Sequence, residues 1–287
     1  MLGGSGYVAG ELLRLLATHP GLRVDGVMSE SQAGAPVRQL FPQQQGRLGD
    51  LVFSSKDALR SALPAGRAAL FSAAPHGASA ALIAEFIAAA DAQGCELSVV
   101  DVSADFRFDK AEDYAAVYGQ AHGAPKLLAS FASALPEHLA DTDKPHIGHP
   151  GCFATALLMA SVPIAALGLA DGELHAVGIT GSTGSGRTPS PTTHHPERHS
   201  NLFAYKALAH RHAPEVMNIC AQITGRRPRL KFVPHSGPFA RGIHLTLQAS
   251  LAGAQSADAL RDAFADFYAD SDFIHITDGT PRLKDVV

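Results

Sequence analysis

A glycine-rich segment near the start of the chain constrains the fold most strongly. Residues 3–10 read Gly-Gly-Ser-Gly-Tyr-Val-Ala-Gly, and they run directly into a segment whose leucines share one helical face. Glycines let a backbone approach a pyrophosphate closely, and a helix N-terminus offers N–H groups and a favourable dipole. This pattern indicates a dinucleotide-binding loop, although an ordinary glycine-rich turn stays open because a lone glycine loop is a weak signal.

Strand-like and helix-like segments then alternate through the first half of the chain. We predict strands at 22–28 and 68–73, a helix at 78–92, and a strand that ends at Asp101. Alternation at these lengths is typical of a parallel, doubly wound Rossmann-type sheet, so we assign residues 1–150 to a nucleotide-binding domain. Only Met1 and Leu2 precede the glycine loop, so we expect the first strand of this domain to be truncated.

The character of the sequence changes after about residue 145. We predict helices at 156–166 and 256–270 and strands at 176–180, 230–233 and 242–250, the last with strict alternation of apolar and polar residues. Alternation of that kind favours a half-buried, largely antiparallel sheet. The fold class is therefore α/β overall, with an α+β catalytic domain over 151–287 whose C-terminal return segment we expect to be missing.

Composition narrows the functional classes. The net charge is −4 and no basic run occurs, so nothing points to nucleic acid or to an anionic membrane. Apolar stretches are too short to span a bilayer, and no secretory leader is recognisable. Three scattered cysteines give neither a disulfide framework nor a zinc site, so we expect a cytoplasmic protein. The histidines at 194, 195 and 199 lack companion ligands at metal-binding spacing, and we expect no metal.

One cysteine has a context that suits catalysis. Cys152 follows Pro150 and Gly151, which break the preceding structure, and an apolar helical segment follows it. A thiol at a helix N-terminus can have its pKa lowered from ~8.5 to ~3.5–7.5, which makes a nucleophilic thiolate available. Burial of Cys152 as a small apolar residue is the alternative. Cys95 and Cys220 lack this context, and we expect both to be packing residues.

Candidate partners for the thiolate lie further along the chain. His210 and His212 are close in sequence and could act as acid/base, although both could equally be surface residues. We expect only one of them to face the site if both are helical, because helical residues two apart point to different faces. The segment 181–187 reads Gly-Ser-Thr-Gly-Ser-Gly-Arg and either contacts a ligand or is a flexible loop. In the same way, Arg187 could meet a carboxylate or a phosphate.

The residues after the second predicted strand bear on the choice of cofactor. An NAD enzyme usually carries an acidic residue there to bind the ribose hydroxyls. This chain has Ser29, Glu30 and Ser31. Small hydroxyl side chains would accommodate a 2′-phosphate and favour NADP, whereas Glu30 keeps NAD open.

Taken together, the motifs resemble the N-acetyl-gamma-glutamyl-phosphate reductase family along nearly the whole chain and in order. The shared segments are the glycine loop with its helix, Ala74-Pro75-His76-Gly77, residues 101–107 (Asp-Val-Ser-Ala-Asp-Phe-Arg), Leu135-Pro136-Glu137, Gly148-His149-Pro150-Gly151-Cys152, residues 181–194, residues 210–215 (His-Arg-His-Ala-Pro-Glu), and Pro238-Phe239-Ala240-Arg241-Gly242. Ser161 departs from the aliphatic residue expected within the cysteine signature. The resemblance implies a two-domain, semialdehyde dehydrogenase-like oxidoreductase of arginine biosynthesis. Such an enzyme reduces N-acetyl-L-glutamyl 5-phosphate with NADPH to the 5-semialdehyde through a cysteine thioester.

The resemblance also implies roles for particular residues and an oligomeric assembly. Cys152 would be the nucleophile and His210 the acid/base, with His212 as second choice or as a substrate contact alongside Arg107 and Arg187; for each arginine a structural salt bridge is the alternative. NADP would be held by Gly4, Ser5, Gly6, Tyr7, Val8, Ser29, Ser31, Pro75, Ser182 and Gly184. We expect a homodimer or homotetramer. The rivals are a reductase of aspartyl phosphate or of carrier-linked aminoadipyl phosphate, and a nucleotide-binding protein without catalysis.

Overall fold

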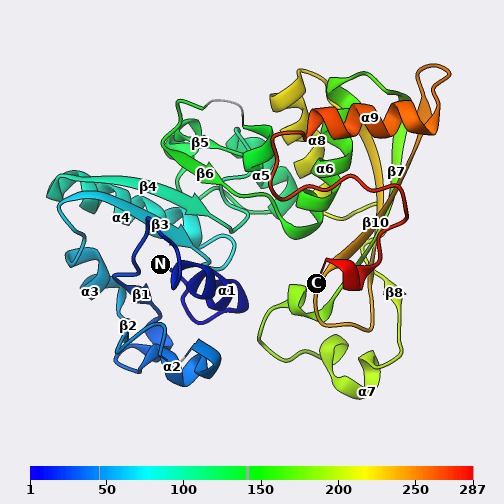
Figure 1. Cartoon of the computed structure of the whole chain (residues 1–287). Coiled ribbons are helices and arrows are strands. Elements are labelled where there is room, and N and C mark those ends of the chain that lie inside the picture. Colours follow the sequence, from blue (N-terminus) through cyan, green and yellow to red (C-terminus); the bar gives the residue numbers. More distant parts are fainter. Residues whose placement is uncertain (45, 140–141, 287) are drawn as a thin grey trace. The chain divides into compact units, whose positions relative to one another are not determined.

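The computed structural model describes residues 1–44, 46–139 and 142–286, which fall into two compact units (Figure 1). Unit 1 contains residues 1–133 and 142–149, and unit 2 contains residues 134–139 and the chain from Pro150 onward. The early segment joins unit 2 because Leu135 packs into the hydrophobic core of that unit. The single boundary predicted at residue 150 does not include this excursion of the chain.

Unit 1 alternates strands and helices. Its elements are α1 (Tyr7–Leu16), β1 (Val27–Met28), α2 (Val37–Leu40), β2 (Phe53–Ser54), α3 (Lys56–Ser61), β3 (Gly66–Ser72), α4 (Ser79–Gln93), β4 (Cys95–Asp101), α5 (Ala111–Tyr118), β5 (Phe131–Ala132) and β6 (His146–Gly148). The strand predicted at 22–28 is regular only at its last two residues, Val27 and Met28.

The strands of unit 1 are all parallel. One sheet has the order β3-β4-β6-β5, and β1 pairs with β2 beside it. Met1 and Leu2 lie between the two sheets, because Met28 N–H donates to the Met1 carbonyl while Leu2 N–H donates to the Phe71 carbonyl. These two residues therefore occupy the strand position that leads into the glycine loop.

Alternation along the strands covers both faces of this sheet. Successive side chains of a strand point to opposite faces. Met1, Val27 and Phe71 pack with α1 in one apolar cluster, whereas their neighbours Leu2, Met28 and Leu70 pack with α4 in another. Helices thus cover both faces, which confirms the predicted doubly wound architecture.

Unit 2 is built on a mixed sheet. Its elements are α6 (Cys152–Ala166), β7 (Ala170–Thr180), α7 (His195–Arg198), β8 (Phe203–Ala204), α8 (His212–Thr224), β9 (Arg229–Ser236), β10 (Ile243–Leu251) and α9 (Ala257–Phe267). The strand order is β10-β7-β9-β8. The β10–β7 and β8–β9 pairs are antiparallel, as predicted, but β7 and β9 are parallel. Their connection contains α8, and a helical crossover lets the chain re-enter a sheet in the same direction.

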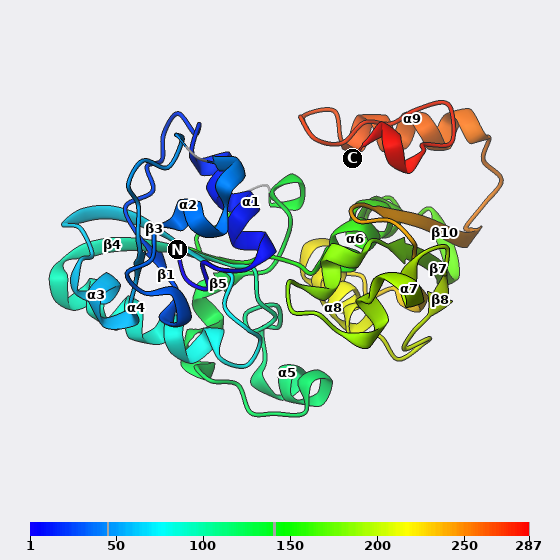
Figure 2. The same cartoon turned by 90° about the horizontal axis from the view of Figure 1, so that it is seen from below.

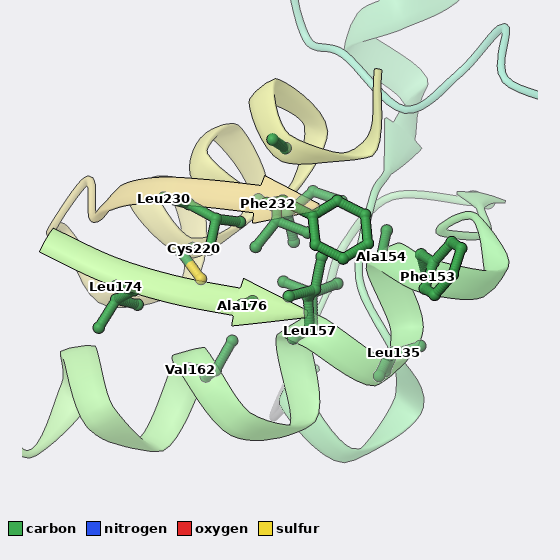
Figure 3. Packing of buried hydrophobic residues seen from close by; sticks show 14 residues of the cluster. Leu135, Phe153, Ala154, Leu157, Val162, Leu174, Ala176, Cys220, Leu230 and Phe232 are labelled. Atoms are coloured by element: carbon green, nitrogen blue, oxygen red, sulfur yellow. The ribbon is translucent and has the colours of Figure 1, made fainter. Parts of the chain in front are cut away.

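The helices α6 and α8 lie on one face of this sheet (Figures 1 and 2). Their apolar side chains meet those of β7 and β9 in a single buried cluster, which includes Leu157, Ile219, Ala176 and Phe232 (Figure 3). Within the described part of the chain, no helix combines the length and the apolar character that crossing a membrane would require.

Candidate active site

Cys152 is the first residue of α6 and its side chain is exposed to solvent. The helix begins there, four residues before the predicted start, because its N-cap residue Gly151 has an extended backbone. No side chain caps this helix N-terminus. The reading of Cys152 as a buried packing residue is therefore wrong, whereas Cys95 and Cys220 are buried as predicted, and burial raises the pKa of the Cys220 thiol to about 11.

His210 and His212 lie close together and are both buried, at 8% and 6% exposure. Only His212 belongs to α8, so the helical argument that one of them must face away does not hold. Their rings are 4.7 Å apart, and both rings pack against Phe153, which follows Cys152 on α6. The structure therefore brings the histidine pair against the start of the cysteine helix, and the surface alternative for these two residues is wrong.

The protonation state of His210 follows from its surroundings. The peptide N–H of His212 donates to Nδ1 of His210 at 3.2 Å, so the neutral ring carries its proton on Nε2. Burial, the largest cause, and the positive charges of Arg211 and Lys206 together lower the pKa of His210 to about 4. His210 is consequently neutral at physiological pH and offers an N–H donor.

Tyr205 is a residue of this site that the sequence reasoning missed. Its ring lies 5.6 Å from that of His210 in an edge-on arrangement. Burial raises the pKa of the Tyr205 hydroxyl, and the electrostatic influence of Cys152 raises it again. Between Tyr205 and His210, Lys206 and Leu208 both adopt positive φ, at 46° and 58°, a region that non-glycine residues occupy at a cost. Such local strain is typical of functional segments, but the amino-acid sequence alone did not indicate it.

Glu215 is the second residue missed. It is fully buried in the first turn of α8, and its Oε1 accepts the peptide N–H of Gly151 at 2.7 Å. The bond joins the helix that follows the histidines to the residue that precedes the cysteine. An acidic residue beside a proline in the first helical turn was visible in the sequence, but its partner 64 positions away was not.

The glycine-rich segment 181–187 is fixed at its base. Gly181 lies against the backbone of Ala240, where a β-carbon would come within 2.4 Å of the carbonyl oxygen. Ser182 N–H and Thr183 N–H donate to the carbonyls of Phe239 and Ala240. Gly184 and Arg187 are exposed further along the segment. The base of this segment is thus held by main-chain bonds, while its tip stays accessible to a ligand.

The glycine loop of unit 1 has the form of a dinucleotide cradle. Gly3 has a φ of 64° and, like Gly4, leaves no room for a β-carbon against its neighbours. Gly6 precedes α1 and has open space, since the nearest atom would be 4.0 Å from a β-carbon there. Tyr7 and Val8 are exposed at the uncapped start of α1, and Ser5 is half-buried. Close packing requires glycine at positions 3 and 4. Gly6 instead faces open space, where a pyrophosphate could approach the backbone.

The residues after β1 favour a 2′-phosphate. Ser29 and Ser31 have their hydroxyl oxygens 3.4 Å apart. Glu30 Oε1 instead accepts the peptide N–H of Lys56, at the start of α3. Glu30 is the only acidic side chain of this loop that could bind the ribose hydroxyls, and its carboxylate is hydrogen-bonded to the start of α3 instead.

Two further predicted residues lie in unit 1. Pro75 is exposed after β3, and its loop is held by Asp105, whose carboxylate accepts the N–H groups of Gly77 and Ala80. Arg107 is buried, at 4% exposure, and donates to the carbonyls of Val102 and His149. These bonds to main-chain carbonyls favour a structural role for Arg107.

The three histidines at 194, 195 and 199 lie at the surface of unit 2. His194, His195 and His199 are exposed, and the rings of His195 and His199 are 5.3 Å apart. Among the described residues, no group of three or more histidine, cysteine or acidic side chains is arranged to hold a metal ion.

Two family descriptions match the chain. Residues 1–139 match the semialdehyde dehydrogenase NAD binding domain, and residues 152–287 match the semialdehyde dehydrogenase dimerisation domain. The second match begins at Cys152, and the two matches together cover most of the chain.

Curated relatives and solved structures agree with these matches. N-acetyl-gamma-glutamyl-phosphate reductase of Pseudomonas aeruginosa is 39% identical over 96% of this chain and 78% of its own length, and that of Azotobacter vinelandii is 38% identical over the same shares. Aspartate semialdehyde dehydrogenase of Candida albicans, solved with NADP, superposes with a TM-score of 0.63 at 14% identity over 91% of this chain and 74% of its own. Aspartate semialdehyde dehydrogenase II of Vibrio cholerae gives 0.66 at 12% identity over 98% and 82%. At these identities the structural likeness shows the shared fold.

Proposed function

The chain belongs to the N-acetyl-gamma-glutamyl-phosphate reductase family within the semialdehyde dehydrogenases, and we propose that it catalyses the NADPH-dependent reduction of N-acetyl-L-glutamyl 5-phosphate to N-acetyl-L-glutamate 5-semialdehyde. This places it in arginine biosynthesis. The observation that carries the proposal is the exposed Cys152 at the start of α6, whose neighbour Phe153 packs against the buried pair His210 and His212.

The glycine loop and the serines after β1 would hold the cofactor. Gly4, Ser5 and Gly6, with Tyr7 and Val8 at the start of α1, would take the pyrophosphate. The hydroxyls of Ser29 and Ser31 would take the 2′-phosphate of NADP, with Pro75, Ser182 and Gly184 as the remaining contacts. When bound, NADPH supplies the hydride of the reaction.

The covalent steps belong to Cys152. Its thiolate attacks the acyl carbon of the acyl phosphate, the acyl–oxygen bond breaks, and phosphate leaves behind a thioester. Reduction of the thioester gives a tetrahedral alkoxide on the same sulfur. Collapse of this alkoxide releases the aldehyde and returns the thiolate. The N-terminal N–H groups of α6 favour the negative charge on the thiolate and on the tetrahedral oxygen.

The histidines would stabilise the oxygen atom of the tetrahedral intermediate. The Nε2–H of neutral His210 can donate a hydrogen bond to the tetrahedral alkoxide as it forms and keep that bond until the thiolate departs. A positioned acid/base group is typically worth ~10²–10⁴-fold in rate. The lowered pKa of His210 makes its imidazolium rare, so His212 is the second candidate for any full proton transfer. Arg187, which is exposed at the end of the glycine-rich segment, is our candidate for the substrate carboxylate or phosphate.

The match to a dimerisation domain bears on assembly. We propose a homodimer, alone or within a homotetramer, formed through the face of the unit 2 sheet that α6 and α8 leave uncovered. Val177, 43% exposed, lies on this face between the exposed His175 and the half-buried Ile179 of the same strand. A biosynthetic reductase of this kind would act in the cytoplasm.

Replacement of the nucleophile tests the reaction. The assay is phosphate-dependent reduction of NADP with N-acetylglutamate 5-semialdehyde, which runs the reaction in reverse. Cys152→Ser should lower kcat by about a thousandfold or more, because serine is not ionised at neutral pH. Alkylation should abolish the activity of the wild type, and Cys95→Ala should keep most of it.

The same assay separates the alternatives. A Cys152→Ser variant that keeps most of its activity would overturn the thioester route. Equal or better turnover of the semialdehydes derived from aspartyl or carrier-linked aminoadipyl phosphate would reassign the substrate. NADP binding without any thiol-dependent turnover would indicate the non-catalytic alternative.

A further inference from the structure

The buried carboxylate of Glu215 touches the cysteine motif directly, and the reaction scheme above gives it no role. We propose that Glu215 is a positioning residue for Cys152: it fixes the peptide N–H of Gly151, and its negative charge sets the acidity of the thiol. The proposal rests on the function assigned to Cys152.

The hydrogen bond from Gly151 determines where α6 begins. Gly151 is the N-cap of α6, with an extended backbone, and Cys152 is the next residue. A glycine at this position has wide backbone freedom, so its conformation needs an external restraint. The carboxylate of Glu215 supplies that restraint at 2.7 Å in a buried setting. The first turn of α6, and with it the thiol, is thereby oriented.

The same bond joins the two chemical groups of the site. Glu215 lies one helical turn after His212 on α8, and its partner immediately precedes Cys152. Packing of Phe153 against both histidine rings also joins these segments. The packing is apolar and weakly directional, whereas a charge-assisted bond to a backbone N–H is short and directional. Glu215 is therefore the group that fixes the cysteine in register with the histidines.

Occupation of the Gly151 N–H also restricts which donors can serve the substrate. That N–H already has a partner, so a tetrahedral oxygen must be stabilised by N–H groups further along the first turn of α6 or by His210. Loss of the Glu215 carboxylate would release a competing donor beside the sulfur. In that case we expect the acyl group to bind in more than one orientation. This should lower kcat by a larger factor than it changes KM.

The charge of Glu215 opposes ionisation of the thiol, because like charges repel. Around Tyr205 and the histidine pair, unit 2 also places the charged or titratable groups Lys206, His210, Arg211 and His212. Of these, Lys206 and Arg211 favour the thiolate, and Glu215 moderates their influence. Removal of the negative charge should therefore lower the pKa of Cys152.

Two substitutions separate position from charge. Glu215→Gln keeps an oxygen acceptor for the Gly151 N–H but loses the charge, whereas Glu215→Ala loses both. The matched control is Glu112→Gln, the same change in the first turn of α5, where Glu112 is exposed. Thermal unfolding establishes that each variant is folded.

The first readout is the rate of iodoacetamide alkylation against pH, which needs no substrate or cofactor. For Glu215→Gln we expect the midpoint of the Cys152 profile to fall by roughly half a pH unit or more, as for loss of a charge several ångströms from a partly solvated group. Glu112→Gln should leave the midpoint unchanged. A midpoint in Glu215→Gln equal to that of the wild type would overturn the electrostatic part of the proposal, even if Glu215→Ala fails to fold.

The second readout is kcat and KM in the NADP assay. Glu215→Gln should keep kcat within about threefold of the wild type, since the Gly151 bond survives, whereas Glu215→Ala should lose about tenfold or more in kcat with little change in KM. A merely structural carboxylate predicts lower thermal stability with unchanged alkylation profiles and unchanged kcat in folded variants, which would overturn the proposal. If the wild type shows no turnover, the proposed substrate is wrong, and the alkylation profiles still decide the role of Glu215.

Discussion

Burial of a single imidazole ring couples the chemistry of the site to folding. His210 is held neutral by its apolar surroundings and by the cations Arg211 and Lys206, which lower its pKa to about 4. In the unfolded chain the pKa of the same ring returns to its ordinary value of 6.5. Between pH 6.5 and 4 the unfolded state therefore binds a proton that the native state does not bind. The stability that His210 contributes is therefore fully present above pH 6.5 and is lost as the pH falls toward 4.

We predict a corresponding difference between the wild type and His210→Gln. Between pH 6.5 and 4.5, the free energy of unfolding of the wild type should fall more steeply than that of the variant, by about 1.4 kcal/mol per pH unit for one proton. Urea denaturation at pH 7.0, 5.5 and 4.5 measures both slopes. His175→Gln is the control, because His175 is 60% exposed and its removal should leave the slope unchanged. Equal slopes for the wild type and His210→Gln would contradict the lowered pKa.

At the scale of the elements, α6 contains a proline whose missing bond is replaced from another segment. Pro163 lies inside the helix and has no N–H to donate to the carbonyl of Met159 four residues earlier. The hydroxyl of Tyr268, just after α9, donates to that carbonyl at 2.8 Å. Because this donation uses the only hydroxyl proton, Nε2 of His138 must donate to the tyrosine oxygen, 2.8 Å away. Three segments of unit 2 are therefore joined where the helix lacks a bond.

This replacement predicts coupling between two positions. Tyr268→Phe should lower the free energy of unfolding by about 1–3 kcal/mol, because it leaves the partly buried Met159 carbonyl without this donor. In a Pro163→Ala background the helix regains its own N–H, so the same change should cost less than half as much. A double-mutant cycle measured by urea denaturation gives the coupling energy. Additive costs would show that Tyr268 does not replace the helix bond.

At the scale of the whole molecule, the uncovered sheet face of unit 2 bears on assembly. Side chains of β7 alternate between the buried Leu174 and Ala176 and the exposed His175 and Val177. Val177 pairs in register with Val233 of β9, and Ile179 lies on the same face of β7, which gives the face an apolar centre. An uncovered apolar centre bordered by polar residues is typical of a protein interface.

We expect a charge in the middle of this face to separate the subunits. Val177→Glu should convert the dimer to a monomer in size-exclusion chromatography with light scattering, because burying an unpaired carboxylate in an interface is costly. Leu167→Glu, at an exposed apolar position just beyond α6, should leave the assembly intact. A Val177→Glu protein that remains dimeric would place the interface elsewhere.

The periodicity of apolar residues and the positions of glycine and proline along the chain determined the fold class and the nature of the chemistry. The glycine loop, the alternating segments and the Pro-Gly-Cys sequence are local patterns, and local backbone preferences suffice to read them. The position of Cys152 at a helix start and the burial of the other two cysteines followed from their neighbours in sequence. The predicted nucleophile is therefore one that local sequence could identify.

Only the tertiary structure decided which distant groups meet. The bond between Glu215 and Gly151, the parallel pairing of β7 with β9, the engagement of Glu30 at α3 and the burial of Arg107 among backbone carbonyls all join segments that are far apart in sequence. Hydrogen bonds and burial depend on distances across the folded chain, and residue order does not specify these distances. Local sequence therefore identified the reactive group, and long-range packing set its orientation and its electrostatic surroundings.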